Sequence, residues 1–391
     1  MLLSIKFYGL FISMILGKAL IMSGAIIVFI LYLLNIVYFK SKDVEKGFSI
    51  PVFLIFISLI ISTFAASYFY DQSLFSTLIS QFDLYLFLFY FLLHKMKPKP
   101  EDLTNMIVII GLIYCLIYFI QFAVYPKVIV ICSMFKDRGT LRIFMPGIGS
   151  MVSAYYILLS RFIASKKPKF ILLLMPTVVV LFLLGTRQAL GIVALMTILM
   201  ILFSKKIKSK FLIFVLIFIC ILPVFLIFQE IYYNMFNVSK TQSAHFQDYV
   251  RVKAAQYYLF NFNHNPIWML VGNGMPAGQS SYAIAIERLQ KTTGYYLNDL
   301  GLIGDFFRYG ALYAVVIVYI LFRLARIKLD EKFSFIRYNA ITDILAIFVG
   351  SGMQSQTIVL LCMSFYIADI NRKEIALGKK AIIDQVANNK S

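Results

Sequence analysis

Long apolar segments separated by short polar stretches make up most of this 391-residue chain. Each is close to the roughly 20 residues that a helix needs to cross a bilayer. This pattern predicts about 12 membrane spans, at 3–17, 19–39, 49–69, 73–93, 104–124, 143–163, 169–185, 188–204, 211–229, 300–322, 339–353 and 355–370. Two apolar runs are too long for one helix, so we expect turns near Lys18 and at Gly185-Thr186-Arg187. The chain is therefore predicted to be an all-α polytopic membrane protein.

The longest polar stretch, 230–299, divides the chain into three predicted parts. Residues 1–229 form a bundle of the first nine helices, and residues 300–391 form the last three helices and a tail. Within the loop, helical patterns at 242–260 and 280–291 flank a turn at Gly272-Asn273-Gly274. A loop of this size is too large to be only a connector. We expect it to pack over the mouth of the bundle and to complete a site there.

Composition and charge agree with this membrane assignment. Apolar residues make up 61% of the chain and charged residues only 14%, which is too little polar surface for a water-soluble globule. The net charge of +19 comes largely from Lys and Arg clusters at the even-numbered ends of the spans. By the positive-inside rule, both termini are predicted to be cytoplasmic and the large loop external. Because the basic residues are not gathered on one soluble face, we expect no nucleic-acid partner.

No cofactor is predicted. The cysteines are scattered without metal-ligand spacing, and the histidines form no cluster. These residues are Cys115, Cys132, Cys220, Cys362, His94, His245 and His264. The sequence also has no phosphate-binding loop or dinucleotide fingerprint, which argues against an ATP-driven pump in this chain.

Isolated basic residues on the predicted external side run against the positive-inside pattern. We interpret the lysines as solvated charges or as partners of lipid phosphate: Lys127, Lys136, Lys240, Lys253 and Lys291. Arg142, Arg187 and Arg251 differ, since each stands beside a turning or aromatic sequence at an expected helix end. A guanidinium group binds a diphosphate through paired hydrogen bonds, so these arginines are predicted to form an anion site.

Four segments of the sequence carry a resemblance to a known family. They are Arg142-Ile143-Phe144-Met145-Pro146, Thr186-Arg187-Gln188-Ala189-Leu190-Gly191, Arg251 followed by Asn265-Pro266 and Gly272-Asn273-Gly274, and Tyr296-Leu297-Asn298-Asp299 leading into the next span. In this order they resemble the O-antigen polymerase and O-antigen ligase superfamily of bacterial envelope enzymes. Arg138 with Gly149 is a weaker match to a motif among the polymerases.

The resemblance implies a GT-C-like architecture and a metal-independent, inverting glycosyl transfer at the outer face of the bacterial cytoplasmic (inner) membrane. The chain would polymerise undecaprenyl-diphosphate-linked repeat units into O-antigen, capsular polysaccharide or exopolysaccharide. Its expected partners are this lipid-linked glycan, membrane lipids and a chain-length regulator in the membrane.

A reaction of this kind needs cations for the departing diphosphate and a general base for the acceptor hydroxyl, and the sequence offers candidates for both. Arg187 and Arg251 would bind the diphosphate, and Arg142 or Arg138 would hold phosphate or sugar. Arg288 and Glu287 would be further substrate-binding residues. The first candidate for the general base is Asp299, with Glu287 behind it; the alternative for Asp299 is a charge that complements a helix dipole.

Two other function classes stay open. A ligase would transfer the finished glycan to a different acceptor, but family ligases carry a His just before the Tyr-Leu pair, and this stretch has none. A lipid-linked oligosaccharide flippase would be expected to have cationic residues inside its spans, and these spans have almost none apart from Arg308. Asp305 and Arg308, one helical turn apart, are predicted to form a structural ion pair. Asp83 inside span 73–93 is a site candidate, with a paired structural role as its alternative.

Overall fold

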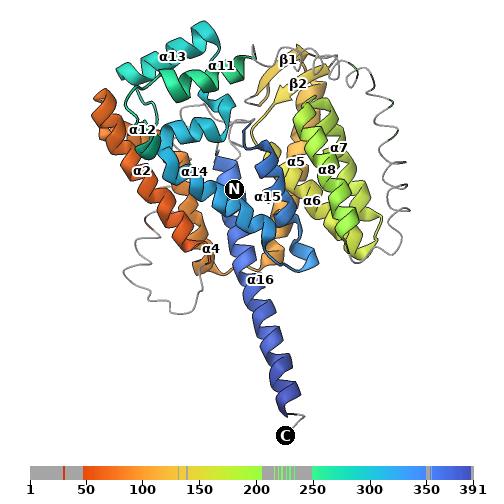
Figure 1. Ribbon diagram of the computed structural model, residues 1–391. Coiled ribbons are helices and arrows are strands. Elements are labelled where there is room, and N and C mark those ends of the chain that lie inside the picture. Colours follow the sequence, from red (N-terminus) through yellow and green to blue (C-terminus); the bar gives the residue numbers. More distant parts are fainter. Residues whose placement is uncertain are drawn as a thin grey trace.

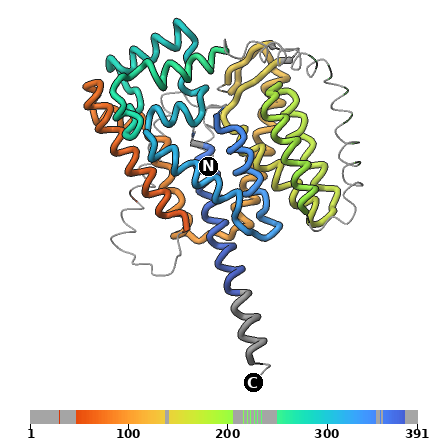
Figure 2. Tube along the Cα trace, in the orientation of Figure 1, coloured from red at the N-terminus to blue at the C-terminus, as the bar shows by residue number. Residues whose placement is uncertain are grey.

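The computed structural model describes residues 47–130, 132–137, 140–204, 249–348, 353 and 355–388, together with a few isolated positions. Within these ranges the protein is mostly helical (Figure 1). A single two-stranded hairpin is the exception among the described residues. The helices form a bundle, and short helices lie across one end of it (Figures 1 and 2).

The first described helix, α2 (Ser49–Tyr70), agrees with the predicted span 49–69. The next predicted span, 73–93, is not one straight helix. It consists of α3 (Leu74–Ser80), the 3-10 helix η2 (Phe82–Leu88) and α4 (Phe89–Met96), with a bend of 65° at the break. Gln81 stands at this break, where its buried side chain accepts a hydrogen bond from Thr63 of α2. Asp83, half-buried, lies just after the bend.

Helix α5 (Pro100–Ala123) begins with Pro100, Glu101 and Asp102, which suit the first turn of a helix. The prediction that the span 143–163 starts at Ile143 is wrong. Strands β1 (Ser133–Asp137) and β2 (Thr140–Phe144) form an antiparallel hairpin first, and α6 (Ile148–Ser165) follows. Pro146 and the left-handed Gly147 (φ 119°) separate β2 from α6 and so delay the start of the helix.

Helices α7 (Lys169–Leu183) and α8 (Arg187–Phe203) lie side by side at the edge of the bundle (Figure 2). The predicted turn at Gly185-Thr186-Arg187 is confirmed, since α7 ends just before it and α8 begins at Arg187. Gly185 has φ 60°, which glycine adopts without strain.

The described part of the predicted large loop forms four short helical pieces and a 3-10 turn, which together we call the cap. They are α11 (Val250–Gln256), the π-helical η4 (Tyr257–Asn261), α12 (Trp268–Val271), α13 (Ser281–Thr293) and η5 (Leu297–Leu300). Tyr258, Trp268, Tyr282 and Phe307 of α14 form the centre of a separate hydrophobic core under the cap. The predicted helices at 242–260 and 280–291 are confirmed for their described residues, as α11 with η4 and as α13.

Three helices complete the bundle: α14 (Leu302–Arg326), α15 (Phe335–Ala346) and α16 (Ser355–Asn388), with the 3-10 turn η6 (Glu331–Phe333) between the first two. The boundaries predicted for span 339–353 are wrong, because α15 starts four residues earlier and ends at Ala346. α14 is kinked at Gly310, which has φ 79° and ψ −177° inside the helix. α16 runs through the centre of the bundle and continues beyond it (Figure 1).

A buried polar cluster joins α2, α4, α14 and α16 at the end of the bundle opposite the cap. The Tyr90 hydroxyl donates to Asp369 Oδ2 at 2.7 Å, and His94 Nε2 lies 3.4 Å from the same oxygen. Arg323 donates to the carbonyl oxygen of Gly47 and lies over the Phe48 ring. These contacts of Asp369 and Arg323 connect the four helices at this end of the bundle.

Among the described residues, four helices are long and apolar enough to cross a membrane: α2, α5, α6 and α14. The bent α3–α4 pair would make a fifth. Helices α7, α8 and α15 are shorter, and the predicted spans 3–17, 19–39 and 211–229 lie almost wholly outside the described residues. The structure is thus that of a mostly helical protein with several helices able to span a membrane.

Candidate functional site

Arg142 fixes the hairpin to the end of α7. It lies opposite Phe135 in the β1–β2 register and is 7% exposed. Its guanidinium carbon lies 4.9 Å from the centre of the Phe144 ring and 5.5 Å from that of Phe135. Arg142 Nε donates a hydrogen bond of 3.0 Å to the carbonyl oxygen of Leu184. Arg142 therefore holds the chain immediately before the Gly185-Thr186-Arg187 turn.

Arg187 occupies the first position of α8, with Thr186 as the N-cap residue. The N-terminus of a helix repels a cation and attracts an anion. An arginine at this position thus adds its charge to that of the exposed backbone N–H groups, and together they make a favourable environment for phosphate. The structure brings two of the sequence-predicted arginines, Arg142 and Arg187, to one turn.

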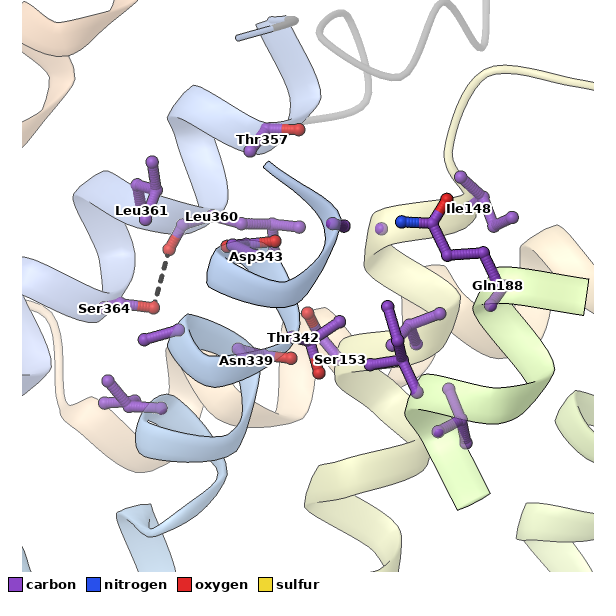
Figure 3. A pocket seen from close by; sticks show the side chains of 18 of the residues that line it. Ile148, Ser153, Gln188, Asn339, Thr342, Asp343, Thr357, Leu360, Leu361 and Ser364 are labelled. Atoms are coloured by element: carbon purple, nitrogen blue, oxygen red, sulfur yellow. Dashed lines mark hydrogen bonds between the residues drawn. The ribbon is translucent and has the colours of Figure 1, made fainter. Parts of the chain in front are cut away.

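A cavity of about 360 Å³ begins at this turn and extends between α6, α8, α15 and α16 (Figure 3). Apolar side chains from all four helices line most of it, including Ile148, Ile192 and Leu360. A minority of the lining is polar: Ser153, Thr186, Gln188, Asn339, Thr342, Asp343, Thr357 and Ser364. A mostly apolar cavity with a few convergent polar groups is typical of a ligand site.

Two of these polar side chains have no hydrogen-bond partner among the described residues. Thr186 Oγ1 is buried at the turn and makes no hydrogen bond. Asp343, on α15, has neither a hydrogen-bond nor an ion-pair partner in the part of the chain that the structure describes. By contrast, the Thr342 and Ser364 hydroxyls bond to Tyr156 and to the Leu360 carbonyl. The Asp343 carboxylate is therefore available to a ligand in the cavity, whereas the Thr186 hydroxyl is covered by its neighbours.

Asp305 and Arg308 form the predicted ion pair in α14. Arg308 Nη1 lies 3.5 Å from Asp305 Oδ1, and both side chains are buried. Arg308 Nη2 also donates to Asn298 Oδ1 at 2.6 Å, and the Met353 backbone N–H donates to Asp305 Oδ2 at 3.0 Å. These contacts support the interpretation that the pair is structural.

Arg251 and Asp299, expected to share a site, lie together on the cap. Arg251 Nη2 is 3.7 Å from Asp299 Oδ2, with side chains 35% and 50% exposed. Neither residue lines the cavity beside Arg187. Asp299 lies in the first turn of η5, before α14 begins, so it is paired with Arg251 and also stands at the start of a short helix. The structure thus separates the predicted arginines into two places.

The remaining predicted residues lie on the cap surface or outside the described residues. Glu287 and Arg288 are exposed on α13. Glu287 Oε1 lies 2.5 Å from Lys291 Nζ, and this hydrogen bond raises the pKa of the Lys291 ammonium. His264 is exposed, whereas Arg138 and His245 lie outside the described residues.

Sequence reasoning missed the cavity residues of α15. Asp343 is the one acidic residue in the apolar stretch 335–350, which marks it as a site candidate by the same argument applied to Asp83. The predicted span 339–353 also contains this carboxylate, but its place in a cavity depends on how α15 packs against other helices, which no local pattern shows.

No group of His, Cys, Asp and Glu that could hold a metal occurs among the described residues. Comparison of the chain with protein-family models, with curated proteins and with solved structures finds no match.

Proposed function

We propose that this chain is a membrane glycosyltransferase that polymerises undecaprenyl-diphosphate-linked oligosaccharide repeat units at the outer face of the bacterial cytoplasmic membrane. The observation that carries the proposal is the Arg187 turn, held by Arg142 at the edge of a largely apolar cavity between helices. A lipid-linked donor has a diphosphate, a hydrocarbon tail and a sugar. The arginine at the turn suits the diphosphate, the apolar lining suits the tail, and the polar side chains of the cavity suit the sugar.

Arg187 and the N-terminus of α8 would bind the diphosphate. As the glycosidic bond to phosphate breaks, negative charge increases on the departing oxygen, and a fixed cation stabilises that charge. Arg142 would not bind the diphosphate itself. It would position Arg187, because its hydrogen bond to the Leu184 carbonyl oxygen holds the turn that precedes α8. The apolar lining of the cavity suits a lipid-linked substrate, and its hydroxyl and amide groups suit sugar hydroxyls.

The Arg251–Asp299 pair has a different place in this proposal. Both charges are partly exposed and already paired on the cap. Such a pair favours the orientation of α11 against η5 and could contact glycan that extends from the cavity. Asp299 as the general base stays a prediction from its place in the sequence.

Deletion of the chain from its native cell tests the proposal. Loss of a polymerase leaves one repeat unit on the final acceptor, because ligation by a separate enzyme continues. Loss of a ligase leaves long glycan on the lipid carrier and none on the acceptor. Loss of a flippase leaves single lipid-linked units on the cytoplasmic face. The first band pattern is the expected one, and either of the others would replace this proposal with the corresponding function.

A further inference from the structure

Asp343 lines two neighbouring cavities. It contributes to the 360 Å³ cavity beside the Arg187 turn and to a second one of about 160 Å³ between α14, α15 and α16. Ala346 and Thr357 also line both. Figure 3 shows the Asp343 carboxylate between α15 and α16, with the Gln188 side chain extending from α8 toward them. Asp343 therefore lies where a molecule bound near Arg187 can reach it.

Three other carboxylates discussed above each have an ion-pair partner. Asp305 shares the smaller cavity but is paired with Arg308 and accepts a hydrogen bond from the Met353 N–H. Asp299 is paired with Arg251, and Glu287 with Lys291. Asp343 has no such partner among the described residues. A carboxylate between membrane helices with no partner is costly, and a ligand hydroxyl would offset this cost.

The position of Asp343 is fixed by its surroundings. The next residue back, Thr342, is hydrogen-bonded to Tyr156 of α6 at 2.8 Å. At the end of α15, the Leu302 N–H of α14 donates to the Ile347 carbonyl oxygen at 2.8 Å. α15 thus cannot rotate freely, and the carboxylate is held toward the cavities. A group that accepts a proton from a substrate needs this kind of fixed orientation.

The size and lining of the larger cavity indicate which kind of substrate Asp343 would meet. The cavity volume matches that of sites for small organic ligands. Its polar groups are hydroxyls, amides and one carboxylate, which are the groups that hydrogen-bond to sugars. Thr186 and Gln188, on either side of Arg187, lie in the same wall. A sugar hydroxyl near Asp343 and a diphosphate near Arg187 would therefore occupy one continuous site.

We infer that Asp343 is the general base of this site and that the cavity beside it binds the acceptor sugar of a lipid-linked glycan. This inference rests on the proposed function. The acceptor hydroxyl oxygen attacks the anomeric carbon of the donor sugar, and the bond from that carbon to the phosphate oxygen breaks. The electron pair leaves with the diphosphate, and the hydroxyl proton passes to the Asp343 carboxylate. One direct displacement of this kind inverts the anomeric configuration.

The test uses the full chain in proteoliposomes, with lipid-linked repeat units extracted from cells that lack the chain. Asp343→Asn keeps the size of the side chain and removes its basicity. General bases contribute on the order of 100-fold or more, so we expect at least about a hundredfold loss of kcat with little change in KM. Asp343→Glu should recover part of the rate. Asp71→Asn is the matched control, since Asp71 is exposed at the left-handed C-cap of α2, a conformation that Asn adopts readily.

The outcomes separate the two proposals. If the wild-type protein joins no repeat units, the proposed function is wrong. If the wild type is active and Asp343→Asn stays within about threefold of it, the base is another group. Should Asp343→Asn not fold, the pH profile of the wild type decides. Its kcat must then fall as the pH is lowered through the range in which a carboxylate takes up a proton, because a protonated carboxyl cannot accept another, and a profile that stays flat down to about pH 4 would exclude a carboxylate base.

Discussion

The carbonyl oxygen of Leu270 in α12 lies so close to Gly310 of α14 that a Cβ atom added there would be only 2.3 Å from it. This close approach occurs at the kink of α14. Just before it, the Phe307 and Arg308 carbonyl oxygens accept hydrogen bonds from the Asn273 and Gly274 N–H groups, at 2.9 Å and 2.8 Å. The backbone of the cap thereby bonds to the backbone of a membrane-length helix at its break, which positions the cap over the bundle.

Gly310→Ala is therefore expected to damage the joint between cap and bundle. Its Cβ would overlap the Leu270 carbonyl oxygen and the Gly272 nitrogen, and φ 79° with ψ −177° is a region that L-residues avoid. We expect a loss of at least about 2 kcal/mol in the free energy of unfolding. Thermal unfolding in detergent, with the yield of folded protein, measures it.

Gly191→Ala is the matched control. Gly191 lies within α8, and a Cβ added there meets no atom within 4 Å. Alanine is the better helix former by about 1 kcal/mol, so this variant should be as stable as the wild type or slightly more so. Equal melting temperatures for the two variants would contradict the importance of the Gly310 contact.

The joint also shows what the sequence could and could not predict. The Gly272-Asn273-Gly274 turn and the helix that begins near Leu302 follow from local residue preferences. That the turn bonds to the break at Gly310 depends on contacts between segments more than thirty residues apart, which no local pattern contains. The same holds at the site. The turn before Arg187 is predictable from Gly185. The contact of Arg142 with this turn is not, because it depends on the β1–β2 hairpin, and the apolar pattern at 143–163 predicted a helix there instead.

The topology can be tested at the two ends of α14. Gln279 on the cap and Lys328 after α14 are both exposed. In a variant whose native cysteines are replaced by alanine, Gln279→Cys should react with an impermeant thiol reagent added to intact cells. Lys328→Cys should react only after the membrane is opened, because the basic cluster around it is expected to be cytoplasmic. The reverse labelling pattern would place the cap in the cytoplasm and remove the basis of the proposed function.

Arg187→Ala should reduce polymer at least about tenfold at unchanged protein level, since a hydrogen bond to a charged group contributes about 1.5–3 kcal/mol. Arg187→Lys should recover little, because an ammonium group lacks the paired geometry of guanidinium. Arg326→Ala is the control, as Arg326 is exposed in the last turn of α14, where its guanidinium lies over the Phe322 ring. Polymer of normal length and amount in Arg187→Ala would remove this residue from the site.

The Arg251–Asp299 pair allows its structural and catalytic interpretations to be separated by charge exchange. At 3.7 Å and with both side chains partly exposed, the pair should contribute no more than about 1 kcal/mol to stability. Arg251→Asp or Asp299→Arg alone places two like charges together and should disturb the contact between α11 and η5. The double variant restores an opposite pair in reversed order, so a structural pair predicts that polymer synthesis returns to within about threefold of the wild type. If Asp299 is the general base or Arg251 binds the diphosphate, the double variant stays inactive, because an arginine cannot accept the proton and an aspartate repels the diphosphate. Polymer synthesis that stays absent in the stably folded double variant would return Asp299 and Arg251 to the reacting groups.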